Sequence, residues 1–209
     1  MAETNPIAVP FLIAFVGWHN SGKTTVAVQV AALLHRQGFR IGVLKSTKES
    51  GLAPDRTGSD TSRYSKAGAL RVALSAPDAL IVRENEESGK NKTRRDPVAL
   101  VRVLFPDMDI VLVEGFKYAK RLPKIEVRRE GIKEGAISAG VSGQEVIALV
   151  CDTPVEENLP CFRTDDSAGI ARFIRGLHEQ HIKQHPTLQP EPGQQRADCP
   201  CTLSTDKTP

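Results

Sequence analysis

The feature that most constrains this chain is a short apolar strand followed at once by a phosphate-binding loop. Residues 11–16, FLIAFV, form an apolar run of strand length, as expected for a strand buried on both faces of a sheet. The next residues, GWHNSGKTT, contain Gly17, four residues, and then Gly22, Lys23 and Thr24. This spacing between a strand and a helix is that of a P-loop, whose backbone N–H groups surround phosphates at the positive end of the helix. The chain is therefore predicted to hold the phosphates of a nucleotide.

The rest of the chain alternates short apolar runs with helical stretches. This order predicts an α/β fold of the P-loop NTPase type, with a mostly parallel sheet flanked by helices and a small antiparallel β extension. Helices are expected at 23–37, 61–67, 97–105 and 167–184. Further strands are expected at 40–45, 109–115 and 145–152, the last of these closing the core, and a hairpin at 70–76 and 79–84. The alternating segment 124–130 is expected at an edge or in a second layer.

Length and composition indicate one domain with a tail. A chain of 209 residues suffices for one well-buried domain. We expect an N-terminal extension at 1–10, a nucleotide-binding domain at 11–185, and a disordered tail at 186–209, where Pro, Gly, Gln and Thr dominate. The net charge of +3 without a long basic run gives little support for nucleic acid binding. No apolar run approaches the roughly 18 residues of a membrane span, and the four cysteines form no disulfide framework for this size, so we expect a cytoplasmic protein.

The P-loop side chains have distinct expected roles. Lys23 would reach the terminal phosphates, and the Thr24 hydroxyl would bind Mg²⁺. Trp18, His19 and Asn20 stand where small residues are common, and Asn tolerates a positive φ better than other non-glycine residues. The expected nucleotide-binding residues are Gly17, Asn20, Ser21, Gly22, Lys23, Thr24, Thr25 and, on a later strand, Asp152.

Three carboxylates are expected to act with this loop. The apolar strand IVLVEG ends in Glu114, where a carboxylate can orient the metal or its water. Asp60 follows the second strand and could reach the γ-phosphate side of the metal. Asp152 ends VIALVCD and could accept hydrogen bonds from guanine, because ligands lie at the carboxyl ends of parallel strands. The expected catalytic residues are Lys23, Asp60 and Glu114, and the expected metal ligands are Thr24, Glu114 and Asp60.

The regulatory-GTPase patterns are imperfect. DRTG at 55–58 has the Asp-x-x-Gly pattern but does not follow an apolar strand. NKTR at 91–94 resembles the guanine-reading Asn-Lys-x-Asp, but Arg94 cannot accept hydrogen bonds from the base. These departures weaken a Ras-like interpretation.

Three histidines at helical spacing allow two interpretations, a metal site or a polar helix face. His178, His181 and His185, with Cys199 and Cys201 in the tail, contain enough donors for a soft metal site. Their spacing matches no standard zinc pattern, so a polar helix face with an inert tail is the preferred interpretation.

Several stretches together resemble the molybdopterin-guanine dinucleotide biosynthesis protein B (MobB) family. They are VGWHNSGKTT, GVLKSTK, DRTGSDTSRYSKAGA, IVLVEGFK with PKIEVRREG, and VIALVCD, in the order and approximate spacing of the family over residues 11–175. The resemblance implies a GTP-binding protein with weak GTPase activity and Mg²⁺ as its metal. It further implies a homodimer that assists the molybdenum cofactor guanylyltransferase, a MobA-like enzyme, with molybdopterin itself as a second candidate ligand.

The same resemblance carries over to single residues. Gly22, Lys23 and Thr24 match positions that hold phosphates and magnesium, and Asp60 and Glu114 match acidic positions near the metal. Lys45 and Lys117 match the lysines that end the family's IK and EGFK segments. The histidine-rich stretch common after the second strand in this family is replaced here by residues 46–49, STKE, so no role of those histidines is carried over.

Two other function classes share the P-loop. One is a small-molecule kinase that uses ATP, with NKTRRD at 91–96 as a basic lid. The other is an ATP-dependent ligase of the dethiobiotin-synthetase type, which also has a strand ending in VEG. The accessory GTP-binding interpretation is favoured because no evident catalytic base stands next to the loop.

Overall fold

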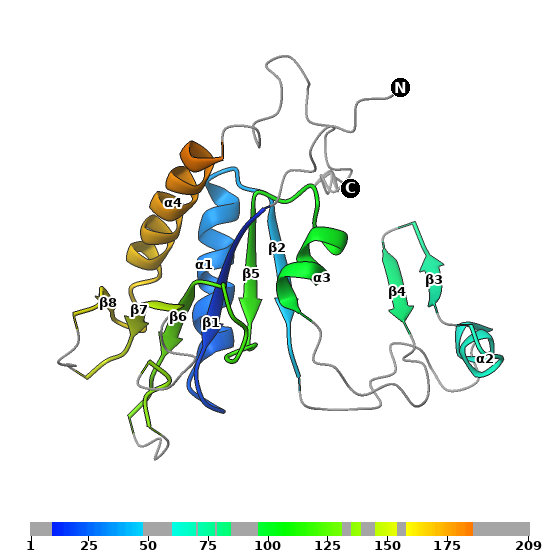
Figure 1. The fold of residues 1–209 in the computed structure, drawn as a ribbon, viewed down its shortest axis with the longest axis horizontal. Helices are drawn as coiled ribbons and strands as arrows, with labels where there is room; N and C mark the ends of the chain where they lie inside the picture. The colour runs from blue at the N-terminus through cyan, green and yellow to red at the C-terminus, as the bar shows by residue number, and fades with distance from the viewer. Residues whose placement is uncertain are drawn as a thin grey trace, which may run out of the picture.

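The main body of the protein is a parallel β-sheet with helices on both faces (Figure 1). The computed structural model describes residues 10–47, 60–69, 71–77, 79–84, 96–130, 135–138, 145–153 and 158–185. Its six-stranded sheet has the order β2-β5-β1-β6-β7-β8, and every adjacent pair is parallel. The strands are β1 (Phe11–Val16), β2 (Ile41–Lys45), β5 (Ile110–Glu114), β6 (Lys124–Val127), β7 (Val146–Val150) and β8 (Cys161–Phe162). The predicted fold class is confirmed.

The helices divide between the two faces because the central strands β1 and β5 carry apolar side chains on both sides. Helices α1 (Lys23–Arg36) and α4 (Ser167–Gln184) lie side by side on one face, where Ile13 and Phe15 of β1 point. Helix α3 (Pro97–Leu104) covers the other face, where Ala14 and Val16 point. This alternation along β1 is the two-residue period of a strand, and it explains why FLIAFV is apolar throughout.

Local sequence signals set the ends of these helices. Asp96 caps α3 by accepting a hydrogen bond from Val98 N at 3.0 Å, and Pro97 occupies the first helical position. Asp166 caps α4 in the same way, accepting from Gly169 N at 2.8 Å. Helix α1 ends at Arg36, and Gly38 follows with φ of 92°. The predicted helix ranges are confirmed to within a residue or two.

Strand β6 corrects one expectation. The alternating segment 124–130 was expected at an edge or in a second layer, but β6 lies between β1 and β7 and is buried. Its polar side chains fit there because each has partners: the fully buried Lys124 donates to Ala119 O at 2.7 Å and pairs with Glu145. Glu126, 1% exposed, accepts from the backbone N–H groups of 137 and 138 and from a neighbouring arginine. Satisfied polar groups can occupy a sheet centre.

Strand β8 corrects a second expectation. We expected 145–152 to be the last core strand, but Cys161–Phe162 adds a short strand beyond β7. Two residues give too short an apolar run for periodicity to detect.

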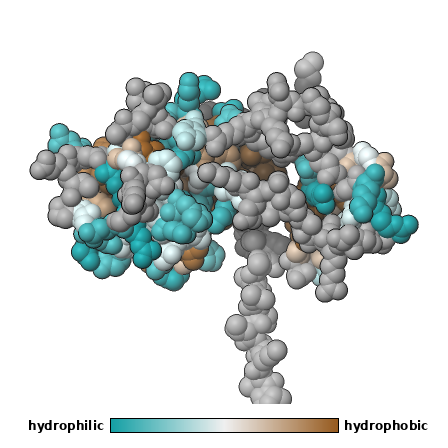
Figure 2. All heavy atoms as spheres, turned by 90° about the horizontal axis from the view of Figure 1, so that it is seen from below, coloured by the Kyte–Doolittle hydropathy of each residue, from teal (hydrophilic) through white to brown (hydrophobic). Residues whose placement is uncertain are grey.

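A smaller unit contains the predicted antiparallel extension. Strands β3 (Arg71–Ser75) and β4 (Leu80–Glu84) pair in an antiparallel hairpin, and helix α2 (Asp60–Lys66) lies beside β3. Exposed apolar side chains mark the hairpin: Leu74, Leu80, Ile81 and Val82. Figure 2 views the molecule from the lower edge of Figure 1; tan and brown residues occur among teal ones on this unit, while teal predominates on much of the described main body.

The helices in the described part of the chain give no membrane span. None of them combines the length and the hydropathy that crossing a bilayer requires.

Candidate phosphate-binding site

The P-loop lies where the sequence predicted it, between β1 and α1 at the carboxyl end of the sheet. Asn20 has φ of 61° and Gly22 has φ of 90°, so both adopt the left-handed conformation. A Cβ on Gly17 would lie 2.4 Å from Val127 O, which shows how closely the loop approaches β6. Gly22 caps α1 without a side-chain hydrogen bond. The first turn of α1 therefore presents backbone donors without a competing side-chain cap, as anion binding requires.

Thr24 and Glu114 meet in this structure, as their predicted shared role requires. The Thr24 hydroxyl donates to Glu114 Oε1 at 2.7 Å. Sheet register produces this contact, because Glu114 stands beside Phe15 of β1 and beside Lys45 of β2. Lys45 Nζ lies 3.1 Å from the same carboxylate oxygen and 3.3 Å from the Thr24 hydroxyl oxygen. A positive group thus already lies beside both oxygens.

The Lys23 side chain folds back onto its own loop. Its ammonium donates to Trp18 O and to Ser21 Oγ, the latter at 3.3 Å. Burial lowers the pKa of Lys23 most, Glu114 opposes this shift, and the charges of Lys45 and Lys117 add to it. An ammonium whose charged form is disfavoured in this way gains from an anionic ligand.

The predicted role of Asp60 near the metal stays a prediction. Asp60 begins α2, which lies beside β3 and well apart from α1 (Figure 1). Its side chain lies outside the described part of the structure.

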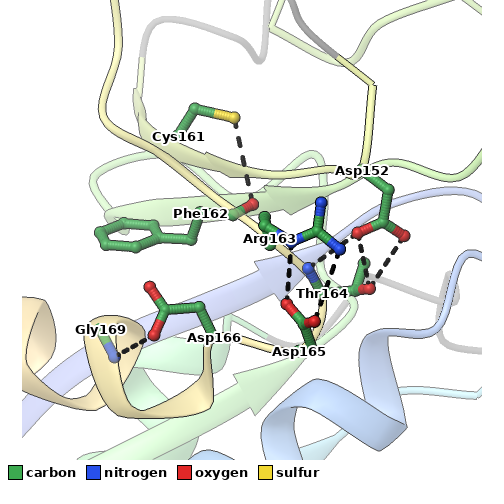
Figure 3. A network of polar contacts seen from close by, with 8 residues as sticks. All are labelled: Asp152, Cys161, Phe162, Arg163, Thr164, Asp165, Asp166 and Gly169. Atoms are coloured by element: carbon green, nitrogen blue, oxygen red, sulfur yellow. Dashed lines mark hydrogen bonds and ion pairs between the residues drawn. The ribbon is translucent and has the colours of Figure 1, made fainter.

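Asp152 lies just after β7 and is engaged by Thr164 (Figure 3). Its Oδ1 accepts from Thr164 N at 3.1 Å and from Thr164 Oγ1 at 2.8 Å, while Oδ2 lies 2.9 Å from the same hydroxyl. These hydrogen bonds lower the pKa of Asp152 further below its usual range. A carboxylate has about four acceptor positions, which leaves capacity for a further donor.

The histidines of α4 pack against aromatic rings. The His178 ring lies 5.3 Å from Phe39 and 6.3 Å from Phe11, and His181 lies 5.6 Å from Phe11. The expected polar helix face is therefore partly a packing surface. Within the described ranges no group of three His, Cys, Asp or Glu residues is placed to hold a metal, and Cys199 and Cys201 fall outside them.

Sequence reasoning missed the contacts of Trp18. Its indole N–H donates to Gly135 O at 2.8 Å, and Lys117 Nζ lies 3.3 Å from the centre of its ring. The signal in the sequence was a bulky aromatic residue in a loop that usually holds small residues. Its partners are distant in sequence, so the pattern alone could not name them.

Comparison with known proteins places the chain in a family. A family model described as "MobB: Molybdopterin guanine dinucleotide synthesis protein B" matches residues 12–152. The chain belongs to this family. The resemblance read from the sequence is thereby confirmed, and with it the place of the chain in molybdopterin guanine dinucleotide synthesis.

Individual relatives are similar to this chain over most of its length. The Escherichia coli (strain K12) "Molybdopterin-guanine dinucleotide biosynthesis adapter protein" is 28% identical over 165 residues, covering 78% of this chain and 90% of its own. The Bacillus subtilis (strain 168) "Probable molybdopterin-guanine dinucleotide biosynthesis adapter protein" is 30% identical over 171 residues, covering 77% and 90%. A crystal structure of molybdopterin-guanine biosynthesis protein B (mobB) has a TM-score of 0.61 at 25% identity, covering 80% of this chain and 99% of its own. The fold of this family is a nucleotide-binding P-loop fold.

Proposed function

We propose that this protein binds GTP with Mg²⁺ on residues 17–25, hydrolyses it slowly, and acts as an adapter for the enzyme that attaches GMP to molybdopterin. The observation that carries the proposal is the contact of Thr24 with Glu114 at the open first turn of α1. It joins a phosphate-binding loop to the strand-end carboxylate that such a loop uses.

The donors present fit a magnesium ion. Thr24 Oγ1 and Glu114 Oε1 are hard oxygen donors, the class that Mg²⁺ prefers. The ammonium of Lys45 beside both oxygens supports a cation at this position. Thr24 and Glu114 would hold the ion, which when bound neutralises charge on the phosphates. Lys23 would leave Trp18 O and contact the terminal phosphates.

The contacts of Glu114 support slow hydrolysis of GTP. The side chain is bound to both Thr24 and Lys45, so it is committed to holding the cation site and does not stand free as a general base. Asp60 is the second candidate catalytic acid and metal ligand. We propose that it reaches the site in the nucleotide-bound protein.

Guanine recognition is proposed for Asp152. The Asp152 carboxylate is ionised at neutral pH, as an exposed aspartate ordinarily is, and an anionic acceptor suits guanine N1 and N2, which both donate. Adenine offers an acceptor at N1, so the same carboxylate would repel it.

The partner enzyme is proposed to be the molybdenum cofactor guanylyltransferase, with molybdopterin as a further ligand. The support is the word "adapter" in the names of the E. coli and B. subtilis relatives. We propose that the protein acts as an adapter in the cytoplasm. We also propose that residues 11–185 form the folded unit that carries this function.

A homodimer through the β3–β4 hairpin is part of the proposal. Leu80 is 68% exposed and Val82 is 51% exposed on this hairpin. A two-stranded hairpin with an uncovered apolar face is marginally stable by itself, and a second copy would cover it. Leu80→Glu with Val82→Glu should lower the sedimentation coefficient from dimer to monomer; a monomeric wild-type protein would contradict this part.

Nucleotide titration tests the central proposal. GTP and ATP, each with Mg²⁺, are titrated into the wild-type protein, Lys23→Ala and Asp152→Asn, with Lys183→Ala on the exposed end of α4 as the control. We expect GTP to bind more tightly than ATP, Lys23→Ala to lose at least about tenfold in affinity, and Asp152→Asn to reduce the preference for guanine.

Two outcomes would favour the other function classes. Preference for ATP with rapid turnover that depends on an added alcohol would indicate a kinase. ATP turnover that depends on a carboxylate substrate would indicate the ligase class. Either result would overturn the adapter proposal.

A further inference from the structure

The segment after β5 turns sharply back toward the P-loop. Gly115 has φ of 93° and Phe116 has φ of 52°, so two consecutive residues adopt the left-handed conformation. A non-glycine residue in this region is uncommon and needs support from its surroundings. Phe116 has that support, because it packs in the same apolar cluster as Trp18. The turn delivers Lys117 to the face of the Trp18 ring, 3.3 Å from its centre.

Trp18 is held from more than one side, so its ring is a fixed surface. Its indole N–H binds Gly135 O at 2.8 Å, and its ring packs against the cluster that includes Val16 and Phe116. A fixed aromatic face below an ammonium is a cation–π contact, which stabilises the charge without neutralising it. Lys117 is therefore held beside the loop with its positive charge still available.

The charges around the P-loop are unbalanced. The charges of Lys45 and Lys117 both act on Lys23, and Glu114 is the carboxylate that opposes them at Lys23 and pairs with Lys45. Holding ammonium groups of like charge together is unfavourable. A ligand with several negative charges would remove that repulsion, and a triphosphate carries more of them than a diphosphate.

We propose that Lys117 is an additional phosphate-contacting cation and that Trp18 is the positioning residue that holds it over the P-loop. The ligand is the outer phosphates of a nucleoside triphosphate. The proposal rests on the nucleotide-binding function proposed above. It assigns to Trp18 a purpose that the ordinary small residue of such a loop cannot serve.

Paired variants test this arrangement in the full-length protein. The affinities of GTP and GDP with Mg²⁺ are measured for the wild type, Lys117→Met, Trp18→Leu, Trp18→Phe and the double variant Lys117→Met with Trp18→Leu. Lys120→Met, an exposed lysine in the same segment, is the matched control. Thermal unfolding of each variant shows that it is folded.

The expected results separate contact from positioning. Lys117→Met should weaken GTP about tenfold and GDP less, Trp18→Leu should weaken GTP about threefold, and Trp18→Phe should lose less than Trp18→Leu because it keeps an aromatic face. The double variant should bind GTP no more weakly than Lys117→Met, because Trp18 acts through Lys117. Trp18 is the single tryptophan of the chain, so its emission should also differ between the wild type and Lys117→Met before nucleotide is added.

The contrary results are equally distinct. Equal losses for GTP and GDP, a double variant in which the two losses multiply, or Trp18 emission that Lys117→Met leaves unchanged would overturn the inference while GTP binding by the wild type stands. A wild-type protein that binds neither nucleotide would overturn the proposed function and this inference with it.

Discussion

Gly17→Ala should test the steric requirement of the P-loop while leaving its polar side chains in place. The added Cβ would lie 2.4 Å from Val127 O and 2.5 Å from Ser21 Oγ, where ordinary contacts begin at 3.4 Å. Either the loop or β6 must therefore move by about 1 Å. Because the interior is close-packed and Ser21 is buried, we expect a loss of about 1–3 kcal/mol in the free energy of unfolding.

The same displacement should weaken nucleotide binding. If the loop binds phosphates as proposed, moving it by about 1 Å would remove at least one backbone hydrogen bond to a phosphate, and charge-assisted bonds of this kind contribute about 1.5–3 kcal/mol. We therefore expect GTP affinity to fall about tenfold or more. Urea denaturation and GTP titration measure the two effects on one preparation.

Gly176→Ala is the matched control. Gly176 lies inside α4, and nothing comes within 4 Å of its added Cβ. Alanine at a helix interior stabilises by about 0.5–1 kcal/mol relative to glycine, so the two substitutions should shift the urea midpoint in opposite directions. A Gly17→Ala protein with the wild-type midpoint and wild-type GTP affinity would refute the steric reasoning.

Three further predictions concern buried and paired groups. Glu126→Ala should lower the free energy of unfolding, measured by urea denaturation, by about 3–5 kcal/mol because it leaves Arg128 without its buried carboxylate. Glu126→Gln should lower it less. Equal losses for the two variants would contradict the importance of this ion pair. Burial and the neighbouring Cys161 thiol raise the pKa of Cys151 to about 12, so Cys151 should resist alkylation at pH 8 in the folded protein, as peptide mass spectrometry would detect; rapid labelling would contradict it. The pKa of Asp152 is lower in the folded protein than the usual carboxyl pKa of about 3.9, so its hydrogen bonds with Thr164 stabilise the fold at any pH above that usual value. This stabilisation is lost as the pH falls through the pKa of the folded protein. Thr164→Val should accordingly lower the denaturation midpoint at pH 7, with the difference disappearing in acid; a difference that persisted there would have another cause.

The sequence by itself determined the elements that local patterns encode. FLIAFV followed by the Gly17-to-Thr24 spacing fixed a buried strand, a loop and a helix in that order, and IVLVEG placed Glu114 at the end of a second buried strand. These features are readable because apolar periodicity and glycine positions act within a few residues of one another. The pairing of Thr24 with Glu114 followed from them, since parallel strands bring their carboxyl ends to one edge.

Tertiary structure decided what depends on partners far along the chain. The alternation in 124–130 predicted an edge or second-layer strand. Strand β6 nevertheless lies inside the sheet, because Glu145 pairs with Lys124 and the backbone N–H groups of 137 and 138 bind Glu126. Trp18 likewise gains its contact with Lys117 only when β5 has placed the EGFK turn against the loop. Burial of a polar group is decided by whether a partner arrives in space, and no periodicity along the sequence records that arrival.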